Sequence, residues 1–181
     1  LSSLIKSEIS GDFKKLMLEI LKANRPSRTD VDDAAANADC ETLYKAGEGK
    51  LGTDEDAFID ILTHRSRTHI HQVCRHYEQK TGHTLEKGIA KETSGDFKKA
   101  LIATIKPEAD YFAQLFDDAM RGLGTNDAQL VRLMSTLTKN QLKKANEAYT
   151  QRHGQTLAAA IKSETSGSYQ KVLLGLLPPI V

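Results

Sequence analysis

The chain repeats itself at a fixed interval, and this feature constrains its fold more than any other. Two similar loops, KLGT at 50–53 and RGLGT at 121–125, contain glycines Gly52 and Gly124 that lie 72 residues apart. Forty residues after each glycine comes an acidic residue in the same setting, Glu-Thr-Ser-Gly. Self-similarity at one period is typical of proteins built from stacked, repeated structural units. The sequence therefore predicts a repeat architecture.

The repeat extends well beyond the loops. Residues 77–101 align with 149–173 at the same offset of 72, and residues 7–13 match 91–97 at an offset of 84. The extra 12 residues (84 − 72) fall in a polar stretch where Pro26 ends the preceding helix. We expect a partial repeat at 1–23, a linker at 24–32 and two complete repeats at 33–106 and 107–181.

Hydrophobic periodicity predicts an all-α fold. After each Ser-Gly or its equivalent, apolar residues recur at i, i+3, i+4, i+7 and i+8, starting from Phe13, Phe97 and Tyr169. This spacing gives each helix one buried face, and no stretch alternates with period two. Each repeat is expected to contain five short helices, which in the first complete repeat span about 33–46, 54–63, 68–80, 84–91 and 95–105.

Threonines are the expected N-caps of two helices in each repeat. Thr53 and Thr125 precede the second helix, and Thr84 and Thr156 precede the fourth. A threonine hydroxyl can accept a hydrogen bond from a free backbone N–H at a helix start. Pro178 and the proline that follows it are expected to end the last helix.

Charge and motif content disfavour several classes of protein. The formal net charge is only +1, so nucleic-acid binding driven by bulk charge is not expected. No nucleophile–base–orienter set can be assembled from motifs, which disfavours an enzyme. The two cysteines, Cys40 and Cys74, do not form a disulfide framework and are expected to be small buried side chains in a reducing cytosol.

The paired loops suggest a binding site for a hard cation. Glycine loops expose backbone carbonyls, and neutral carbonyls with one carboxylate suit Ca²⁺. Three carbonyls and a bidentate carboxylate supply about five of the 6–8 oxygens that Ca²⁺ takes, which leaves room for a phosphate oxygen. Leu51 and Leu123 lie at the loop tips, where exposed apolar side chains suit contact with a lipid surface. The alternative is that each leucine folds back onto its own repeat.

These residues resemble the annexin family. The segments 46–55 and 119–125 are similar to the A–B loops of the third and fourth annexin repeats, and the two Glu-Thr-Ser-Gly turns match the D–E loops. The linker falls where annexins join their second and third repeats. The resemblance implies right-handed superhelical repeats of five helices, here named A to E. Glu8 matches the second-repeat carboxylate without its partner loop, so the chain is expected to be either part of a longer protein, which Glu8 favours, or a short relative of the family.

The resemblance also implies metal ligands. The third-repeat site would use the carbonyls of Gly47, Lys50 and Gly52 with the carboxylate of Glu92, and the fourth-repeat site the carbonyls of Met120, Gly122 and Gly124 with the carboxylate of Glu164. Two residues depart from the family or from the other repeat: Asn126 replaces the usual aspartate, and Leu137 stands where the previous repeat has Arg65.

The function implied by the resemblance is Ca²⁺-dependent binding to anionic phospholipid. Such a protein would be cytoplasmic and peripheral at membranes when Ca²⁺ is present. The alternative is a Ca²⁺-independent helical scaffold that binds a protein partner such as the cytoskeleton. Lysine pairs such as Lys98 and Lys99 are candidates for contact with anionic head groups or glycans, although solvated surface is the better account.

Two further motifs carry less weight. Residues 47–52 match G-x-G-x-x-G, but a dinucleotide site needs a preceding strand and a βαβ unit. His69 and His76 can share one helix face, yet a solvated or partly buried face explains them better than a zinc site.

Overall fold

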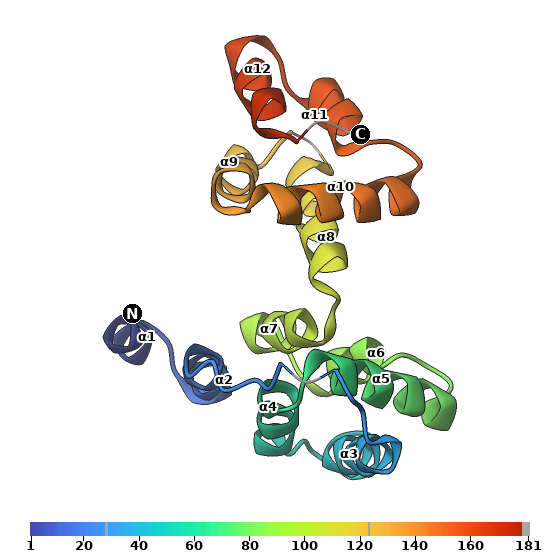
Figure 1. The fold of residues 1–181 in the computed structure, drawn as a ribbon. Helices are drawn as coiled ribbons and strands as arrows, with labels where there is room; N and C mark the ends of the chain where they lie inside the picture. The colour runs from blue at the N-terminus through green and yellow to red at the C-terminus, as the bar shows by residue number, and fades with distance from the viewer. Residues whose placement is uncertain (28, 123, 179–181) are drawn as a thin grey trace. The chain divides into compact units, whose positions relative to one another are not determined.

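The computed structural model describes residues 1–27, 29–122 and 124–178, and within these residues the regular structure is entirely α-helical, as predicted (Figure 1). The twelve helices of the described residues are α1 (Ser2–Glu8), α2 (Gly11–Leu21), α3 (Asp33–Ala46), α4 (Glu55–His64), α5 (Arg67–Thr81), α6 (Leu85–Glu92), α7 (Gly95–Ile105), α8 (Glu108–Met120), α9 (Asp127–Thr136), α10 (Lys139–His153), α11 (Leu157–Glu164) and α12 (Gly167–Leu176).

The helices form two compact units, one of residues 1–105 and one of residues 106–181. In the first unit α3 packs against α5, and α4 packs against α3 and α7. In the second unit the helices in the same positions pair in the same way: α8 packs against α10, and α9 packs against α8 and α12. Each unit has its own hydrophobic core, centred on Leu43, Leu62 and Tyr77 in the first and on Phe116, Leu130 and Leu157 in the second.

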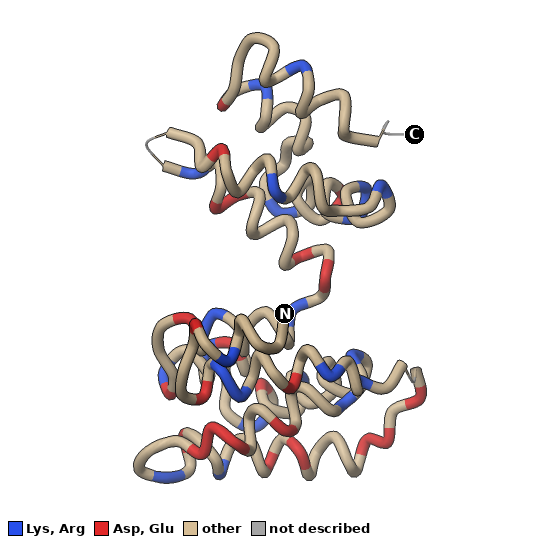
Figure 2. Tube along the Cα trace, turned by 90° about the vertical axis from the view of Figure 1, so that its left-hand side faces the viewer, with Lys and Arg blue, Asp and Glu red and all other residues tan. Residues whose placement is uncertain are grey.

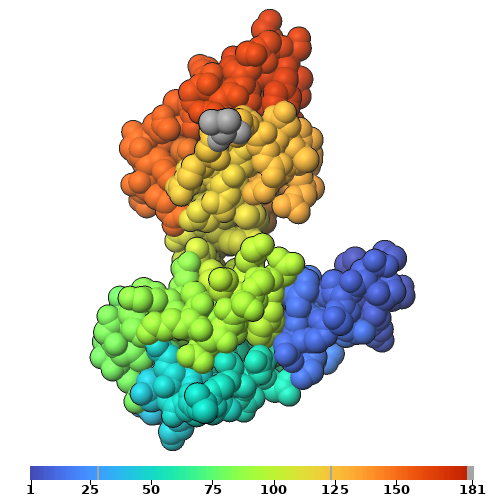
Figure 3. All heavy atoms as spheres, turned by 180° about the vertical axis from the view of Figure 1, so that it is seen from behind, coloured from blue at the N-terminus to red at the C-terminus, as the bar shows by residue number. Residues whose placement is uncertain are grey.

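The first unit contains two additional helices, α1 and α2. Helix α2 lies against α4 and α7, where Leu16 is fully buried (Figure 3). The edge of this contact carries an ion pair of 2.9 Å between Lys15 Nζ and Asp56 Oδ1. The apolar stripe of α2 therefore contributes Leu16 to the hydrophobic core of the first unit.

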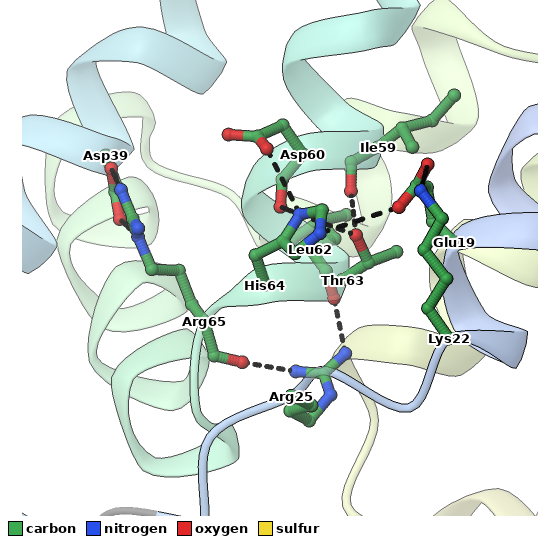
Figure 4. Close-up of polar contacts among 10 residues, drawn as sticks. All are labelled: Glu19, Lys22, Arg25, Asp39, Ile59, Asp60, Leu62, Thr63, His64 and Arg65. Carbon is green, nitrogen blue, oxygen red and sulfur yellow. Dashed lines mark hydrogen bonds and ion pairs between the residues drawn. The ribbon is translucent and has the colours of Figure 1, made fainter.

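Arg25 fixes the chain after α2 to the C-terminal end of α4 (Figure 4). Its guanidinium donates to the carbonyl of Arg65 at 2.7 Å and also to the carbonyl of Leu62. The last carbonyls of a helix have no intrahelical donor, so an arginine that reaches them satisfies groups that would otherwise need water. A second contact, 3.5 Å between Glu19 Oε2 and His64 Nε2, ties α2 to the same helix end.

The predicted helix caps are partly wrong. Asp54 caps α4 by accepting from Ala57 N at 3.2 Å, and Asn126 caps α9 by accepting from Gln129 N at 3.1 Å. Thr53 and Thr125 each lie one residue too early for this role. Threonine, aspartate and asparagine are all good N-caps, so the sequence alone does not decide which of two neighbouring residues caps the helix. The predicted caps of α6 and α11 are confirmed, since the hydroxyls of Thr84 and Thr156 accept from Lys87 N and Ala159 N.

The end of the last helix and the burial of Cys40 agree with expectation within the described residues, whereas Cys74 is less buried than expected. Helix α12 ends at Leu176, two residues before Pro178, and the second proline lies outside the described residues. Cys40 is buried and Cys74 is half-buried, and both are free. Burial raises the pKa of the Cys74 thiol to about 12, so the thiol stays protonated at neutral pH.

An ionic cluster around the buried Asp39 and His69 distinguishes the first unit from the second. The carboxylate of Asp39 accepts from Arg65 at 2.6 and 3.1 Å and lies 2.8 Å from His69 Nε2. In the second unit the matching positions hold Phe112 and Leu137, which pack against the hydrophobic core. The departure at Leu137 therefore changes the packing inside the repeat.

Substitution of Asp39 by asparagine should lower the free energy of unfolding by about 2 kcal/mol at pH 7, because it leaves the buried His69 and the more exposed Arg65 without their anion. Burial raises the pKa of Asp39, but the bonds and charges of Arg65 and His69 outweigh it and lower the pKa overall. A lowered pKa gives stability above the unfolded value of about 3.9 that is lost on acidification, so the difference between wild type and D39N should shrink below about pH 4. Urea unfolding across pH measures both effects, and exposed Glu78→Gln is the control.

Candidate functional site

The loops between α3 and α4 and between α8 and α9 are closed by the same hydrogen bond. Asp54 N donates to Ala46 O at 2.7 Å in the first unit, and Asn126 N donates to Ala119 O at 2.7 Å in the second. The first loop is one residue longer, yet the bond joins matching positions. Both loops are thus held as closed turns at the end of their unit.

Glycines in both loops adopt a backbone conformation that other residues disfavour. Gly52 has φ +82° and Gly124 has φ +92°, in the left-handed region. A Cβ atom at either position would meet nothing within 4 Å. Backbone conformation, and not lack of space, therefore explains why glycine is required there.

A threonine hydroxyl joins each glycine loop to the turn after the fourth helix of its unit. Thr53 Oγ1 lies 3.1 Å from the carbonyl oxygen of Glu92 and 3.2 Å from its carboxylate Oε2. Thr125 Oγ1 donates to the carbonyl oxygen of Glu164 at 3.2 Å. The structure thus brings together the loop and the acidic residue that the sequence paired at a distance of 40 residues. The sequence pattern assigned these threonines to helix capping and did not predict this role.

Gly47 leaves the space that the Glu92 side chain fills. A Cβ atom at Gly47 would lie 3.0 Å from Glu92 Cγ and 3.3 Å from Phe58 Cζ. The Gly47 carbonyl accepts from Lys50 N at 3.0 Å, and a carbonyl oxygen keeps a second lone pair for another partner. Of the ligands predicted for this site, Gly47 and Glu92 are in contact, and Gly52 is joined to them through its neighbour Thr53.

The matching site in the second unit is built differently. Met120 takes the place of Gly47, and its side chain is buried. Glu164 is exposed whereas Glu92 is half-buried. Gly122 has φ +108°, so this loop has a positive φ before its last glycine, which Gly47 and Gly49 of the first loop do not have. The part of this loop at Leu123 lies outside the described residues, so the structure does not place that predicted membrane contact.

An acidic residue inside the first loop is anchored by three side chains. Glu48 accepts from Lys91 Nζ at 2.6 Å and from Tyr77 Oη at 2.8 Å, and His83 Nε2 lies 3.1 Å from it. Burial raises the pKa of Glu48, but the hydrogen bonds and positive charges outweigh burial and hold the pKa below its usual value. The loop is therefore anchored at its centre to α5 and α6.

Gly88 makes this anchor possible. A Cβ atom there would lie 2.6 Å from Tyr77 Oη, which is too close for any real contact. The second unit has Ala160 at the matching position, and Arg121 takes the place of Glu48 and pairs with Asp117 instead. This network was not predicted from the sequence. The feature of the sequence that could have indicated this network is Glu48, an acidic residue in the longer of the two loops.

Leu51 projects fully into solvent at the tip of the first loop, with an exposed fraction of 104%. It does not fold back onto its own unit. Exposure of one leucine is ordinary on a protein surface. Its place beside the predicted Ca²⁺ ligands makes it the candidate membrane contact of this loop.

The histidines considered for zinc have other partners. His69 lies against Asp39, and His76 Nε2 lies 2.9 Å from Asp33 Oδ1. Across the described part of the chain, no three or more His, Cys, Asp and Glu side chains form a group that could hold a metal. The two carbonyl loops are the cation sites that the sequence predicts.

Comparison with known proteins identifies the family. The family model of the annexins matches residues 38–104 and 111–176, which together include both glycine loops and both acidic turns. The chain belongs to the annexin family. Calcium-dependent phospholipid binding is characteristic of annexins, which are generally non-enzymatic.

Individual annexins share sequence and fold with most of this chain. Human annexin A11 is 38% identical over 177 residues, which are 96% of this chain and 35% of annexin A11. The solved structure of annexin III has 33% identity and a TM-score of 0.89, over 97% of this chain and 55% of that protein. A calcium-bound structure of annexin (Sm)1 has 27% identity and a TM-score of 0.81, over 99% of this chain and 54% of that protein. The chain thus spans between about a third and about a half of these annexins.

Within the described residues, no helix has the length and apolar character needed to cross a membrane.

Replacing Thr53 by valine tests whether its hydroxyl positions the Glu92 carboxylate or stabilises the start of α4. Because Asp54 caps α4, T53V should lower the free energy of unfolding in chelator by only about 1 kcal/mol, the value of one hydrogen bond. Its effect on Ca²⁺ affinity should be larger, about tenfold, because the Glu92 carboxylate loses the group that positions it. D54A is the matched control, and it should lose about 1 kcal/mol of stability through the cap with less change in affinity. Calorimetric titration with Ca²⁺ and urea unfolding measure the two quantities.

Proposed function

We propose that this annexin chain binds anionic phospholipid surfaces through Ca²⁺ held at each of its two glycine loops. The observation that carries the proposal is the contact between loop and acidic turn, made by Thr53 with Glu92 and by Thr125 with Glu164. Two units of the same chain use the same contact to join a carbonyl-rich loop to one acidic residue. This donor set, neutral oxygens with a single carboxylate, is the type that Ca²⁺ prefers.

Each unit would supply its own ligands. The first site would use the carbonyls of Gly47, Lys50 and Gly52 with the carboxylate of Glu92, and the second site those of Met120, Gly122 and Gly124 with that of Glu164. The close approach of Glu92 to Gly47 supports this assignment in the first unit. In the second unit the support is the hydrogen bond of Thr125 and the positive φ of both glycines.

A site of this kind is incomplete without its lipid. Three carbonyls and one bidentate carboxylate give about five oxygens, and Ca²⁺ takes 6–8. A lipid phosphate oxygen can fill the remaining positions, so Ca²⁺ and membrane should each strengthen the binding of the other. The formal net charge of +1 gives little attraction to anionic lipid by itself, so attachment should require the ion.

The remaining assignments follow from the same proposal. Residues 1–23 are the end of a preceding annexin repeat, 24–32 a linker, and 33–106 and 107–181 two annexin repeats, as the family matches at 38–104 and 111–176 support. The chain acts without catalysis or nucleic acid, in the cytoplasm, at membranes when Ca²⁺ is present. Cytoskeletal or glycan partners would act in addition to lipid.

The carboxylates provide the direct test. Wild type should co-sediment with vesicles that contain phosphatidylserine when Ca²⁺ is present, and it should stay in solution with chelator. Glu92→Gln and Glu164→Gln should each raise the Ca²⁺ concentration for half-maximal binding by about tenfold, because a neutral amide replaces the only anionic ligand of the site. The double variant should not sediment at the Ca²⁺ level that saturates wild type.

Glu78→Gln is the control, because it removes one exposed carboxylate from α5, away from either acidic turn. In parallel, Ca²⁺ should raise the melting temperature of wild type but not of the double variant, since a ligand of the native state stabilises it. Equal sedimentation of wild type and double variant, with and without chelator, would reject the proposal in favour of a Ca²⁺-independent helical scaffold.

Leu51 should contribute to the attachment and not to the ion site. Leu51→Ala removes apolar surface that is fully exposed in the free protein, so it should weaken vesicle binding by roughly threefold to tenfold at saturating Ca²⁺. The melting temperature should not change. The control is Leu4→Ala. It shortens a leucine of α1 that is also largely exposed, and this variant should bind as wild type does. Equal binding by both variants would remove Leu51 from the membrane contact.

A further inference from the structure

Glu48 lies inside the first glycine loop, between two of the predicted Ca²⁺ ligands, and it is held by residues from outside the loop. Its carboxylate accepts from Tyr77 Oη of α5 at 2.8 Å and from Lys91 Nζ of α6 at 2.6 Å. The carbonyl of Gly47 belongs to the peptide unit that joins Gly47 to Glu48, and a peptide unit is planar. Fixing Glu48 therefore restricts the direction of a carbonyl that is expected to bind the ion.

Backbone hydrogen bonds fix the same part of the loop to the end of α3. Gly49 N donates to Tyr44 O at 2.8 Å, and Lys50 N donates to Gly47 O at 3.0 Å. A Cβ atom at Gly49 would lie only 3.0 Å from Tyr44 O, so this glycine is packed closely against the helix. This part of the loop is thus held to α3 by its backbone, and to α5 and α6 by the Glu48 side chain.

The second loop has different contacts at the matching positions. Arg121 takes the place of Glu48, and it pairs with Asp117 of the helix before it, α8. A guanidinium has no acceptor, so it cannot accept the hydrogen bond of a tyrosine hydroxyl as Glu48 does. Lys91 is replaced by Ser163, whose hydroxyl donates to a carbonyl of its own helix, α11, at 2.8 Å. The side chains at these two positions therefore make contacts along one helix and do not join the loop to another.

The acidic turns differ in the same direction. Glu92 is half-buried, and its Oε2 lies 3.2 Å from the hydroxyl of Thr53, whereas Glu164 is exposed. A group that is already held in place loses less conformational freedom when it binds a ligand. The first site is therefore the more ordered of the two before an ion arrives.

We propose that Glu48 is a positioning residue that lets the first site take up Ca²⁺ before lipid arrives, whereas the second site takes up Ca²⁺ only together with lipid. This order of filling rests on the proposed function, since it concerns the same two loops. A loop that is already held loses little freedom when an ion binds, so its affinity without lipid is higher. The second loop must be ordered at that moment, and a lipid phosphate offsets the loss by adding an oxygen ligand. The chain then reaches the membrane with one ion bound and acquires the other there.

Glu48 acts through its position and not through its charge. Lys91 Nζ lies 2.6 Å from Oε1 of Glu48, and His83 Nε2 lies 3.1 Å from Oε2, so the negative charge is balanced by its neighbours. Basic and acidic residues are interspersed along the first unit (Figure 2), and the loop itself contains both Lys50 and Glu48. A carboxylate that is paired in this way attracts a more distant ion only weakly.

The test is calorimetric titration of the 181-residue chain with Ca²⁺ in the absence of lipid, with one site disabled at a time. Glu164→Gln leaves the first site, and Glu92→Gln leaves the second. The form that keeps the first site should bind Ca²⁺ about tenfold more tightly than the form that keeps the second. With vesicles that contain phosphatidylserine, both forms should need similar Ca²⁺ concentrations for half-maximal sedimentation, because lipid then completes and orders either site.

Two substitutions test Glu48 in the form that keeps the first site. Glu48→Gln should weaken lipid-free Ca²⁺ binding by about tenfold, and Tyr77→Phe by about threefold. Tyr77→Phe leaves the carboxylate and its charge in place and removes one of the hydrogen bonds that hold it. Tyr149→Phe, the matching substitution in the second unit, is the control and should leave the affinity of the Glu92→Gln form unchanged. Circular dichroism and the melting temperature check that every variant folds.

Two further measurements separate position from charge. Adding Lys91→Met to Glu48→Gln restores the net charge, so attraction at a distance predicts that the Ca²⁺ affinity recovers, and a positioning role predicts that it does not. In chelator, the backbone amides of residues 47–52 should exchange hydrogen faster in Glu48→Gln and in Tyr77→Phe than in wild type. The amides of the second loop should exchange at the wild-type rate in both variants.

The outcomes distinguish the role of Glu48 from the proposed function. Equal lipid-free affinity of the two single-site forms, recovery of affinity in the double variant, or unchanged exchange at residues 47–52 would each overturn the positioning role and leave the proposed function standing. Binding of Ca²⁺ by neither form, with or without vesicles, would instead reject the proposed function itself.

Discussion

The contact between a threonine hydroxyl and the acidic turn 39 residues later holds each candidate site together. In both units it joins the loop that follows the first helix to the turn that follows the fourth helix. Without it, the loop carbonyls and the carboxylate would be placed only by the packing of helices on either side. Ion sites need their ligands held to within a fraction of an ångström, and helix packing alone leaves more freedom than that. The hydroxyl provides the short-range constraint.

The two units place the glycine loop and the acidic turn in the same way, but different side chains hold the loop in each. In the first, Gly47 admits the Glu92 side chain, Gly88 admits Tyr77, and Glu48 ties the loop to three side chains. In the second, Met120 and Ala160 occupy the two glycine positions, and Phe112 replaces the buried carboxylate of the first unit. Beyond the contacts that both loops share, the first loop is thus fixed by the Glu48 network, and the second by the pair of Arg121 with Asp117 and the burial of Met120. A binding site built on the first is more preorganised, because its carboxylate is half-buried and already positioned.

The sequence predicted the fold well because the fold depends on periodicity. A helical spacing of 3.6 residues and an offset of 72 are properties of the chain itself, so the residues alone indicate the helices and the family. Roles that depend on tertiary contact were less accessible. Thr53 and Asp54 are both good caps, and only the position of the Glu92 turn decides that Thr53 faces it. The Glu48 network was missed for the same reason, since its partners come from α5 and α6.

In a repeat protein, the apolar surfaces at which repeats meet must also be covered. Each unit buries its own core, but the face formed by its second and fifth helices stays apolar because a neighbouring helix normally covers it. In the first unit α2 covers that face, and Ile59 is buried as a result. In the second unit the residues of that face kept their apolar character: Val131, Val172 and Leu176 are exposed, although no buried role within the described part of the unit requires them to be apolar. Exposing such a strip has a free-energy cost of about 25 cal/mol for each Å² of apolar surface. A surface of this composition is explained by what covers it, as the contact of α2 with α4 and α7 illustrates in the first unit.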